Sequence, residues 1–129
     1  MPVNNRTRGH SGEREAVNLI KDNLGIDCSR NLDQTRDGGC DIILPGWAVE
    51  VKRCRKVTEP LKRSWWAQAH RQAEAMQLEP VVLFRADRAP WKALVALPEY
   101  FDRDDQRSVV EMDIELWFAM ARESLNIHI

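Results

Sequence analysis

Two short apolar runs on either side of a turn constrain the fold of this chain more than any other feature. Residues 42–44 and 47–51 flank Pro45-Gly46, a dipeptide typical of a tight turn. The pattern predicts a β-hairpin. Because side chains alternate along a strand, Glu50 and Lys52 should share one face, roughly 6–7 Å apart along it.

A second acid stands at the start of this hairpin. Asp41 comes at the start of the strand that is expected to pair with the Glu50 strand. Its side chain can therefore approach the same point as the side chains of Glu50 and Lys52. Carboxylate oxygens suit Mg²⁺ or Mn²⁺, and a lysine suits a phosphate or a metal-activated water. A solvated strand face is the common alternative for an isolated Glu-x-Lys. The Gly-Gly before Asp41, the apolar strands and the basic run after Lys52 favour a metal site here.

The composition is that of one ordinary globular domain. The chain has 129 residues, 43% of them hydrophobic and 30% charged, and we expect a single domain whose first ten residues form a mobile basic arm. No apolar stretch approaches the roughly 20 residues that span a bilayer, and the first residues do not contain the apolar h-region expected of a signal peptide. We therefore expect no membrane partner and a cytoplasmic location in a bacterial, archaeal or phage-infected cell. The three cysteines lack a CxxC spacing, which favours free thiols over a zinc site.

Charge is unevenly distributed, although the net charge is only −1. Residues 52–71 contain seven Lys or Arg against one acid, and residues 99–123 contain eight acids. A further basic cluster lies near the N-terminus. Ordinary surface coverage could explain each cluster alone, but two basic clusters around an acidic motif predict a phosphate-binding face. The cations that we expect to bind DNA are Arg6, Arg8, Arg53, Arg55, Lys56, Lys62 and Arg63.

Periodicity and turn signals predict the remaining elements. Before the hairpin we expect a helix from Ser11, as its N-cap, to residue 23, with Gly25 at its exit, and a strand over residues 26–30. After it we expect, in order, a basic loop over 55–63, a helix over 64–78, strands over 81–84 and 91–97, an acidic loop over 98–107, a strand over 108–112 and a helix from Asp113 to residue 124. This order predicts an α/β sandwich with a mixed central sheet.

Glu13 is a further candidate for the acidic cluster. Its helical phase groups it with Val17, Ile20 and Leu24 on the inward face, whereas Glu15 should point to solvent. A buried acid is costly unless it is paired or bound to a metal. The alternative is that the helix dipole alone offsets the cost.

Aromatic and amide side chains mark the second helix. Its apolar stripe of Trp65, Trp66, Ala69, Ala73 and Met76 should pack on the sheet. Gln68 and Gln72 border the stripe, either as stabilising amides or as polar groups near the acids, and Gln68 is favoured because it is nearer the helix start. The five tryptophans, at positions 47, 65, 66, 91 and 117, fit core packing better than base stacking.

The motifs together resemble those of the PD-(D/E)xK nuclease superfamily, with Cys40-Asp41 where the family often has Pro-Asp. More narrowly, a Gly-x-x-x-Glu-Arg-Glu helix, then Gly-Gly-x-Asp-Ile and Glu-Val-Lys, look like the archaeal-type Holliday junction resolvases, over about residues 6–97. Similar small nucleases occur in phages and prophages. The resemblance implies a restriction-endonuclease-like three-layer sandwich, a mixed central sheet flanked by helices, with a C-terminal strand and helix appended.

The resemblance also implies the roles of the site residues. Asp41, Glu50 and the Val51 backbone carbonyl would hold Mg²⁺ or Mn²⁺, and Glu13 would bind a second metal or orient its water. Lys52 would stabilise charge on the scissile phosphate, with Gln68 beside it.

The function implied is a metal-dependent endonuclease acting on DNA, branched DNA first, as a homodimer because a junction is cut at symmetric points. One alternative is a phage or restriction-like nuclease acting on flaps, ends or linear duplex. Another is a non-catalytic DNA-binding subunit that retains the fold.

Overall fold

The computed structural model describes residues 5–31, 39–97 and 108–127 of the chain. The described residues form three helices and five strands, in the order α1 (Asn5–Leu24), β1 (Ile42–Leu44), β2 (Trp47–Cys54), α3 (Glu59–Met76), β3 (Glu79–Ala86), β4 (Lys92–Ala96), β5 (Val109–Asp113) and α4 (Ile114–Ile127). Within these ranges no helix is both long and apolar enough to cross a membrane.

The strands form one mixed sheet in the order β1-β2-β3-β4-β5. The predicted hairpin is confirmed: β1 and β2 pair antiparallel, with Ile42 opposite Val49, and Gly46 takes the positive φ of 84° that its turn requires. The β2–β3 pair is parallel, because α3 forms the crossover between them, and the remaining pairs are antiparallel.

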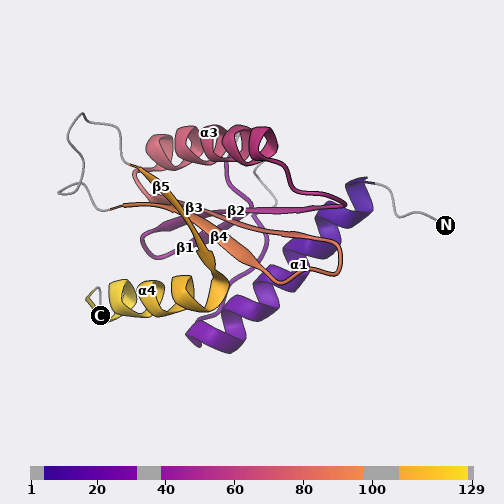
Figure 1. The fold of residues 1–129 in the computed structure, drawn as a ribbon. Helices are drawn as coiled ribbons and strands as arrows, with labels where there is room; N and C mark the ends of the chain where they lie inside the picture. Colours follow the sequence, from indigo (N-terminus) through magenta and orange to yellow (C-terminus); the bar gives the residue numbers. More distant parts are fainter. Residues whose placement is uncertain (1–4, 32–38, 98–107, 128–129) are drawn as a thin grey trace.

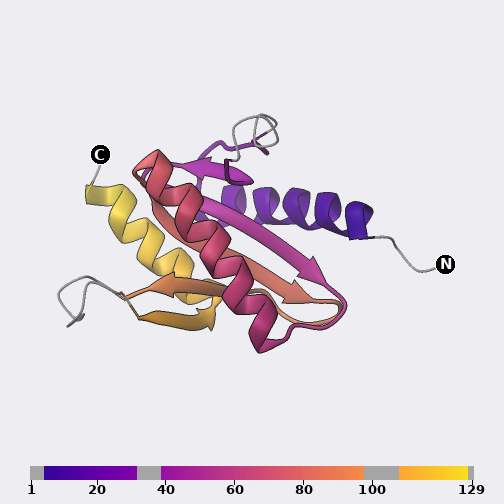
Figure 2. The same cartoon turned by 90° about the horizontal axis from the view of Figure 1, so that it is seen from above.

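Helices cover both faces of the sheet, which confirms the three-layer sandwich. Figure 1 shows α3 on one face and α1 with α4 on the other, and Figure 2 shows α3 lying over the sheet. The larger core lies on the α1 and α4 side, where Ile20, Val51 and Trp117 are buried together. The smaller core on the α3 side contains Trp65 and Phe84. Four of the five tryptophans are buried, as predicted, and Trp66 is half-buried.

The first helix begins earlier than the sequence predicted. It starts at Asn5, so the expected mobile arm is helical from that residue onward. Ser11 is therefore not the N-cap but lies within the helix, and its Oγ accepts a hydrogen bond from Arg53. Its polar first turns have no apolar periodicity, and so the sequence offered no signal for them. Its exit is as predicted, since Gly25 has a φ of +67° and donates to the Lys21 carbonyl.

The strand predicted over residues 26–30 is wrong. Only Arg30 pairs in the described part of this segment, through one isolated bridge to Ile42. The neighbouring strand β1 has three residues, which leaves a longer strand no partner to pair with.

The second predicted helix also begins earlier, at Glu59 rather than residue 64. Thr58 caps it by accepting a hydrogen bond from the Leu61 amide, and Pro60 lies within the first turn, where its missing N–H is harmless. The helix ends at Met76 with Gln77 in the left-handed conformation, rather than at residue 78. Trp65, Ala69 and Ala73 of the predicted stripe are buried, and Met76 is half-buried.

The C-terminal strand and helix form as predicted, as β5 and α4, to within three residues. The acidic loop predicted over 98–107 lies outside the described residues, as do the side chains of Arg6 and Arg8.

Candidate active site

Three acidic side chains are buried where α1 approaches the β1–β2 hairpin. Glu13 is 7% exposed, Asp41 6% and Glu50 2%, and no other acidic side chain in the described part of the chain is buried. Glu13 comes from the inward face of α1, as its helical phase predicted. Asp41 lies just before β1, and Glu50 lies in β2. Burial of three acids in one region needs a compensating positive charge.

Hydrogen bonds to neighbouring backbone groups fix Asp41 immediately before the start of β1. Its N–H donates to the Val49 carbonyl at 3.0 Å, and its carbonyl accepts from the Asn31 N–H at 2.7 Å. Its side-chain Oδ2 accepts from the Val51 N–H at 2.7 Å. The carboxylate thus accepts a hydrogen bond from the β2 backbone that a further residue of β1 would otherwise accept.

The same edge presents the Val51 carbonyl. Backbone groups alternate along a strand, and those of Val49 and Val51 both meet Asp41 on the β1 side. The carbonyl of Val51 therefore points to the edge at which the Asp41 carboxylate lies.

Glu50 is the least satisfied of the three acids. Its Oε2 atom is buried and has no hydrogen-bond partner. Burial, followed by the hydrogen bond and charge of Asp41, raises the pKa of Glu50 to about 9. The unpartnered oxygen of Glu50, the Asp41 carboxylate and the Val51 carbonyl together form a suitable set of ligands for a hard divalent cation. The residues therefore fit the metal that their sequence motif implies.

Glu13 has a partner that sequence reasoning missed. The Arg30 Nε–H donates to Glu13 Oε2 at 2.6 Å, and the two side chains are 25% and 10% exposed. Burial and the charge of Asp41 still raise the pKa of Glu13. In the part of the chain that is described, no group of three or more His, Cys, Asp or Glu side chains is arranged to hold a metal ion.

Lys52 and Gln68 meet beside the acids. The Lys52 Nζ donates to Gln68 Oε1 at 3.1 Å, joining β2 to α3. Glu50 and Lys52 lie opposite Val82 and Phe84 of β3, which face α3, so both side chains project to that face. Gln72, the alternative that the sequence left open, has a buried Oε1 without a partner.

A hollow of about 530 Å³ opens on the same side of α3. Gln68 and Gln72 contribute to its wall, together with Arg71, a cation that the sequence placed in the basic run but not among the DNA contacts. All the residues that line it belong to α3, and Gln68 connects it to Lys52.

The predicted DNA-binding cations fall into two groups. Arg53 pairs with Asp87 at 3.4 Å, and Lys62 pairs with Glu59 at 2.6 Å and with Glu111 at 2.8 Å. These two are therefore committed to internal contacts. The side chains that lie exposed are Arg55, Lys56 and Arg63.

The prediction that Glu15 points to solvent is wrong. Its carboxylate accepts from Arg85 at 3.0 Å and from the Trp91 indole at 2.8 Å. Burial alone would raise the pKa of Glu15, but the two hydrogen bonds together with the charges of Arg85 and Arg53 outweigh it and lower the pKa. The ends of β3 and β4 reach this side of α1, which a helical phase cannot predict.

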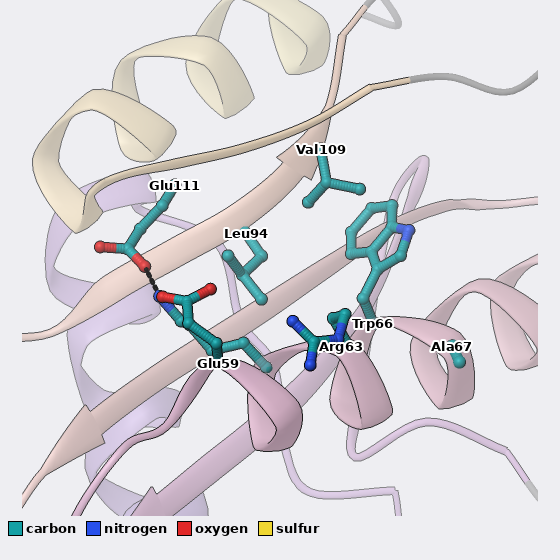
Figure 3. A pocket seen from close by; sticks show the side chains of 8 residues that line it. Glu59, Arg63, Trp66, Ala67, Leu94, Val109 and Glu111 are labelled. Carbon is teal, nitrogen blue, oxygen red and sulfur yellow. Dashed lines mark hydrogen bonds and ion pairs between the residues drawn. The ribbon is translucent and has the colours of Figure 1, made fainter.

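A second groove lies on the far side of α3, away from the acids. Figure 3 shows it between α3 and the β4–β5 edge, with Trp66, Leu94 and Val109 as apolar walls and Glu111 near them. Lys62 also lines the groove and forms an ion pair with Glu111. The volume of the groove is about 310 Å³, and none of Glu13, Asp41 and Glu50 lines it.

Comparisons with known proteins show the family and the fold of this chain. The family model described as "Phage putative PDDEXK endonuclease" matches residues 4–117. The match includes β5 and the start of α4, and so extends past residue 97, where the sequence resemblance ended. Protein D14 of Escherichia phage T5 is 27% identical over an aligned length of 118, and the match covers 75% of this chain and 72% of that protein.

Among solved structures, the chain resembles Archaeoglobus fulgidus Hjc, a Holliday junction resolvase from an archaeal hyperthermophile. The TM-score is 0.55 at 16% sequence identity, and the match covers 86% of this chain and 95% of Hjc. At this identity the likeness shows a common fold.

Proposed function

Because this chain belongs to the family of phage putative PDDEXK endonucleases, we propose that it is a metal-dependent nuclease that hydrolyses phosphodiester bonds within DNA, with branched DNA as its substrate. One observation carries the proposal: the Glu50 carboxyl is buried without a partner for Oε2, directly beside Asp41. Such a pair is unfavourable by itself and becomes favourable when a divalent cation lies between the two groups.

Asp41, Glu50 and the Val51 carbonyl would hold Mg²⁺ or Mn²⁺. All three supply oxygen, the ligand these ions prefer, and the set offers no thiolate or imidazole that would favour zinc. The cation, when bound, would activate the attacking water and neutralise charge on the scissile phosphate. The Val51 N–H keeps the Asp41 carboxylate oriented for this task at 2.7 Å.

Lys52 would place a positive charge against the phosphate. Gln68 accepts from its Nζ and so holds the ammonium on the α3 side of the sheet, next to Glu50. A fixed cation that meets negative charge developing in the transition state lowers the barrier without needing to rearrange. Gln68 is thus a positioning residue for Lys52.

Exposed cations would bind the DNA backbone. Arg55 and Lys56 follow β2 directly, and Arg63 lies in the second turn of α3. Arg71 lies in the hollow beside Gln68. The likeness of the fold to a Holliday junction resolvase supports a four-way junction as the first substrate to test, and a homodimer would supply the two symmetric cuts.

The proposal is tested by incubating the protein with a four-way junction, a flap and a linear duplex, each in Mg²⁺ and in EDTA. We expect cleavage of the junction in Mg²⁺ only. Preferred cleavage of the flap or duplex would mean a phage or restriction-like nuclease instead. Binding of all three without cleavage would mean a DNA-binding subunit and would contradict catalysis.

Lys52→Ala, with Lys92→Ala as its control, separates chemistry from general charge. Lys92 pairs with Asp113 at 2.8 Å on another strand, and its loss removes the same charge from the protein. The Lys52 variant should lose cleavage while the Lys92 variant keeps it. Equal rates for the two variants would remove Lys52 from the catalytic residues.

A further inference from the structure

Arg30 is held beside the acidic cluster by the backbone as well as by its side chain. Its isolated bridge to Ile42 fixes its backbone next to β1, one residue from Asp41. The following residue, Asn31, donates its N–H to the Asp41 carbonyl at 2.7 Å and its side-chain amide to the Cys40 carbonyl at 3.0 Å. The segment that carries Arg30 is therefore tied to the segment that carries Asp41.

The Arg30 side chain meets the acids at Glu13. Its Nε lies 2.6 Å from Glu13 Oε2, and the two side chains are three-quarters or more buried. Arg30 has no second ion pair within the described residues. The planar guanidinium of an arginine suits an ion pair with a carboxylate in a partly buried place such as this one.

Resting on the function proposed above, we propose that Arg30 is a positioning residue that occupies, against Glu13, the place where a two-metal nuclease would bind its second cation. The chain then binds a single divalent ion, at Asp41 and Glu50. Glu13 is in this account a partner of Arg30 rather than a metal ligand.

Electrostatic repulsion explains why the Arg30 guanidinium excludes a second metal ion. Paired metals in nucleases lie about 3.5–4 Å apart and share acidic ligands. A second ion between Glu13 and Asp41 would have to share the Glu13 carboxylate with Arg30, which already holds its Oε2, and it would place a divalent cation beside the guanidinium. That arrangement is repulsive in a partly buried site.

The number of bound metal ions tests this inference directly. Mn²⁺ can be titrated into the full-length protein without DNA and the bound ions counted by electron paramagnetic resonance. We expect one Mn²⁺ per wild-type chain and two per Arg30→Gln chain, because the substitution frees Glu13. Arg30→Lys keeps the positive charge and should bind one. The double variant Arg30→Gln, Glu13→Gln should return to one, since the ligand for the second ion is gone.

Two Mn²⁺ ions in the wild type would overturn the inference and leave the proposed function intact, as would one ion in a folded Arg30→Gln variant. No bound Mn²⁺ in the wild type would contradict both proposals. If Arg30→Gln fails to fold, Arg30→Met, which keeps an aliphatic stem without the charge, takes its place and should also bind two ions; one ion in that variant would overturn the inference. A role of Arg30 in folding alone would lower the thermal midpoint of the variants without changing the number of ions.

Discussion

Replacing Glu50 with glutamine should change how the stability of the metal-free protein depends on pH. Glu50 is 2% exposed, and burial together with Asp41 raises its pKa from an ordinary 4.5 to about 9. The folded chain thus keeps a proton on Glu50 across a range of pH in which the unfolded chain has lost it. Stability should therefore fall as pH rises from 4.5 towards 9.

The size of this effect follows from the one proton involved. A difference of one bound proton changes the free energy of unfolding by about 1.4 kcal/mol per pH unit. From pH 6 to pH 8 the loss from Glu50 is then at most about 3 kcal/mol, a large share of the roughly 5–15 kcal/mol that stabilises a typical domain. Glutamine does not titrate, so Glu50→Gln should remove this part of the slope.

Urea unfolding at pH 6, 7 and 8 in EDTA measures the slope for each variant. Glu15→Gln is the matched control, because the pKa of Glu15 is lowered by Trp91 and Arg85 and its carboxylate is charged in both states above pH 6. That variant should be less stable by a constant amount, with the wild-type slope. Adding Mg²⁺ should flatten the wild-type slope, since the ion binds the deprotonated carboxylate. Equal slopes for wild type and Glu50→Gln would refute the assignment of a retained proton to Glu50.

Three further outcomes are expected. Cleavage should require Mg²⁺ or Mn²⁺ while Ca²⁺ supports binding only, because the proposed ligands are all oxygens; full cleavage in EDTA would exclude the metal site. Replacing Arg55, Lys56 and Arg63 by alanine should make DNA affinity less sensitive to salt. The slope of log affinity against log salt concentration should become shallower by up to about 0.9 per lost phosphate contact. Lys62→Ala should leave that slope unchanged, since Lys62 is bound by Glu59 and Glu111, and a change would place it on the DNA. Trp117→Ala, at a fully buried position, should cost about 3–5 kcal/mol in urea unfolding, and a cost below 1 kcal/mol would mean that α4 is not part of the core.

Local signals in the sequence predicted the parts of the fold that depend on local structure. The hairpin of β1 and β2 follows from two apolar runs and a Pro-Gly turn, and Glu13 was placed inward by helical phase alone. The start of α1 was missed by six residues, because its first turns are polar and carry no periodicity. The start of α3 was missed by five residues, although Thr58 as N-cap and Pro60 in the first turn are both signals of a helix start.

Contacts between distant segments were harder to predict. Glu15 was assigned to solvent, yet Arg85 and Trp91 bind it from elements 70 or more residues away. Arg30 reaches Glu13 across 17 residues from a segment without regular structure, so neither periodicity nor a motif pointed to it. The choice between Gln68 and Gln72 likewise depended on how α3 is rotated over β2.

Metal-dependent cleavage by the Asp41→Asn variant tests the central claim most directly. Asparagine keeps the size of the side chain and an oxygen for the Val51 N–H, but it removes the charge that would bind the cation. Asp113→Asn makes the same change at an exposed position paired with Lys92 and serves as the control. In Mg²⁺, with a saturating amount of protein over a labelled four-way junction, Asp41→Asn should cut at least about a hundredfold more slowly than wild type. It should still bind the junction, and Asp113→Asn should cut at the wild-type rate. A wild-type rate for Asp41→Asn would contradict the account.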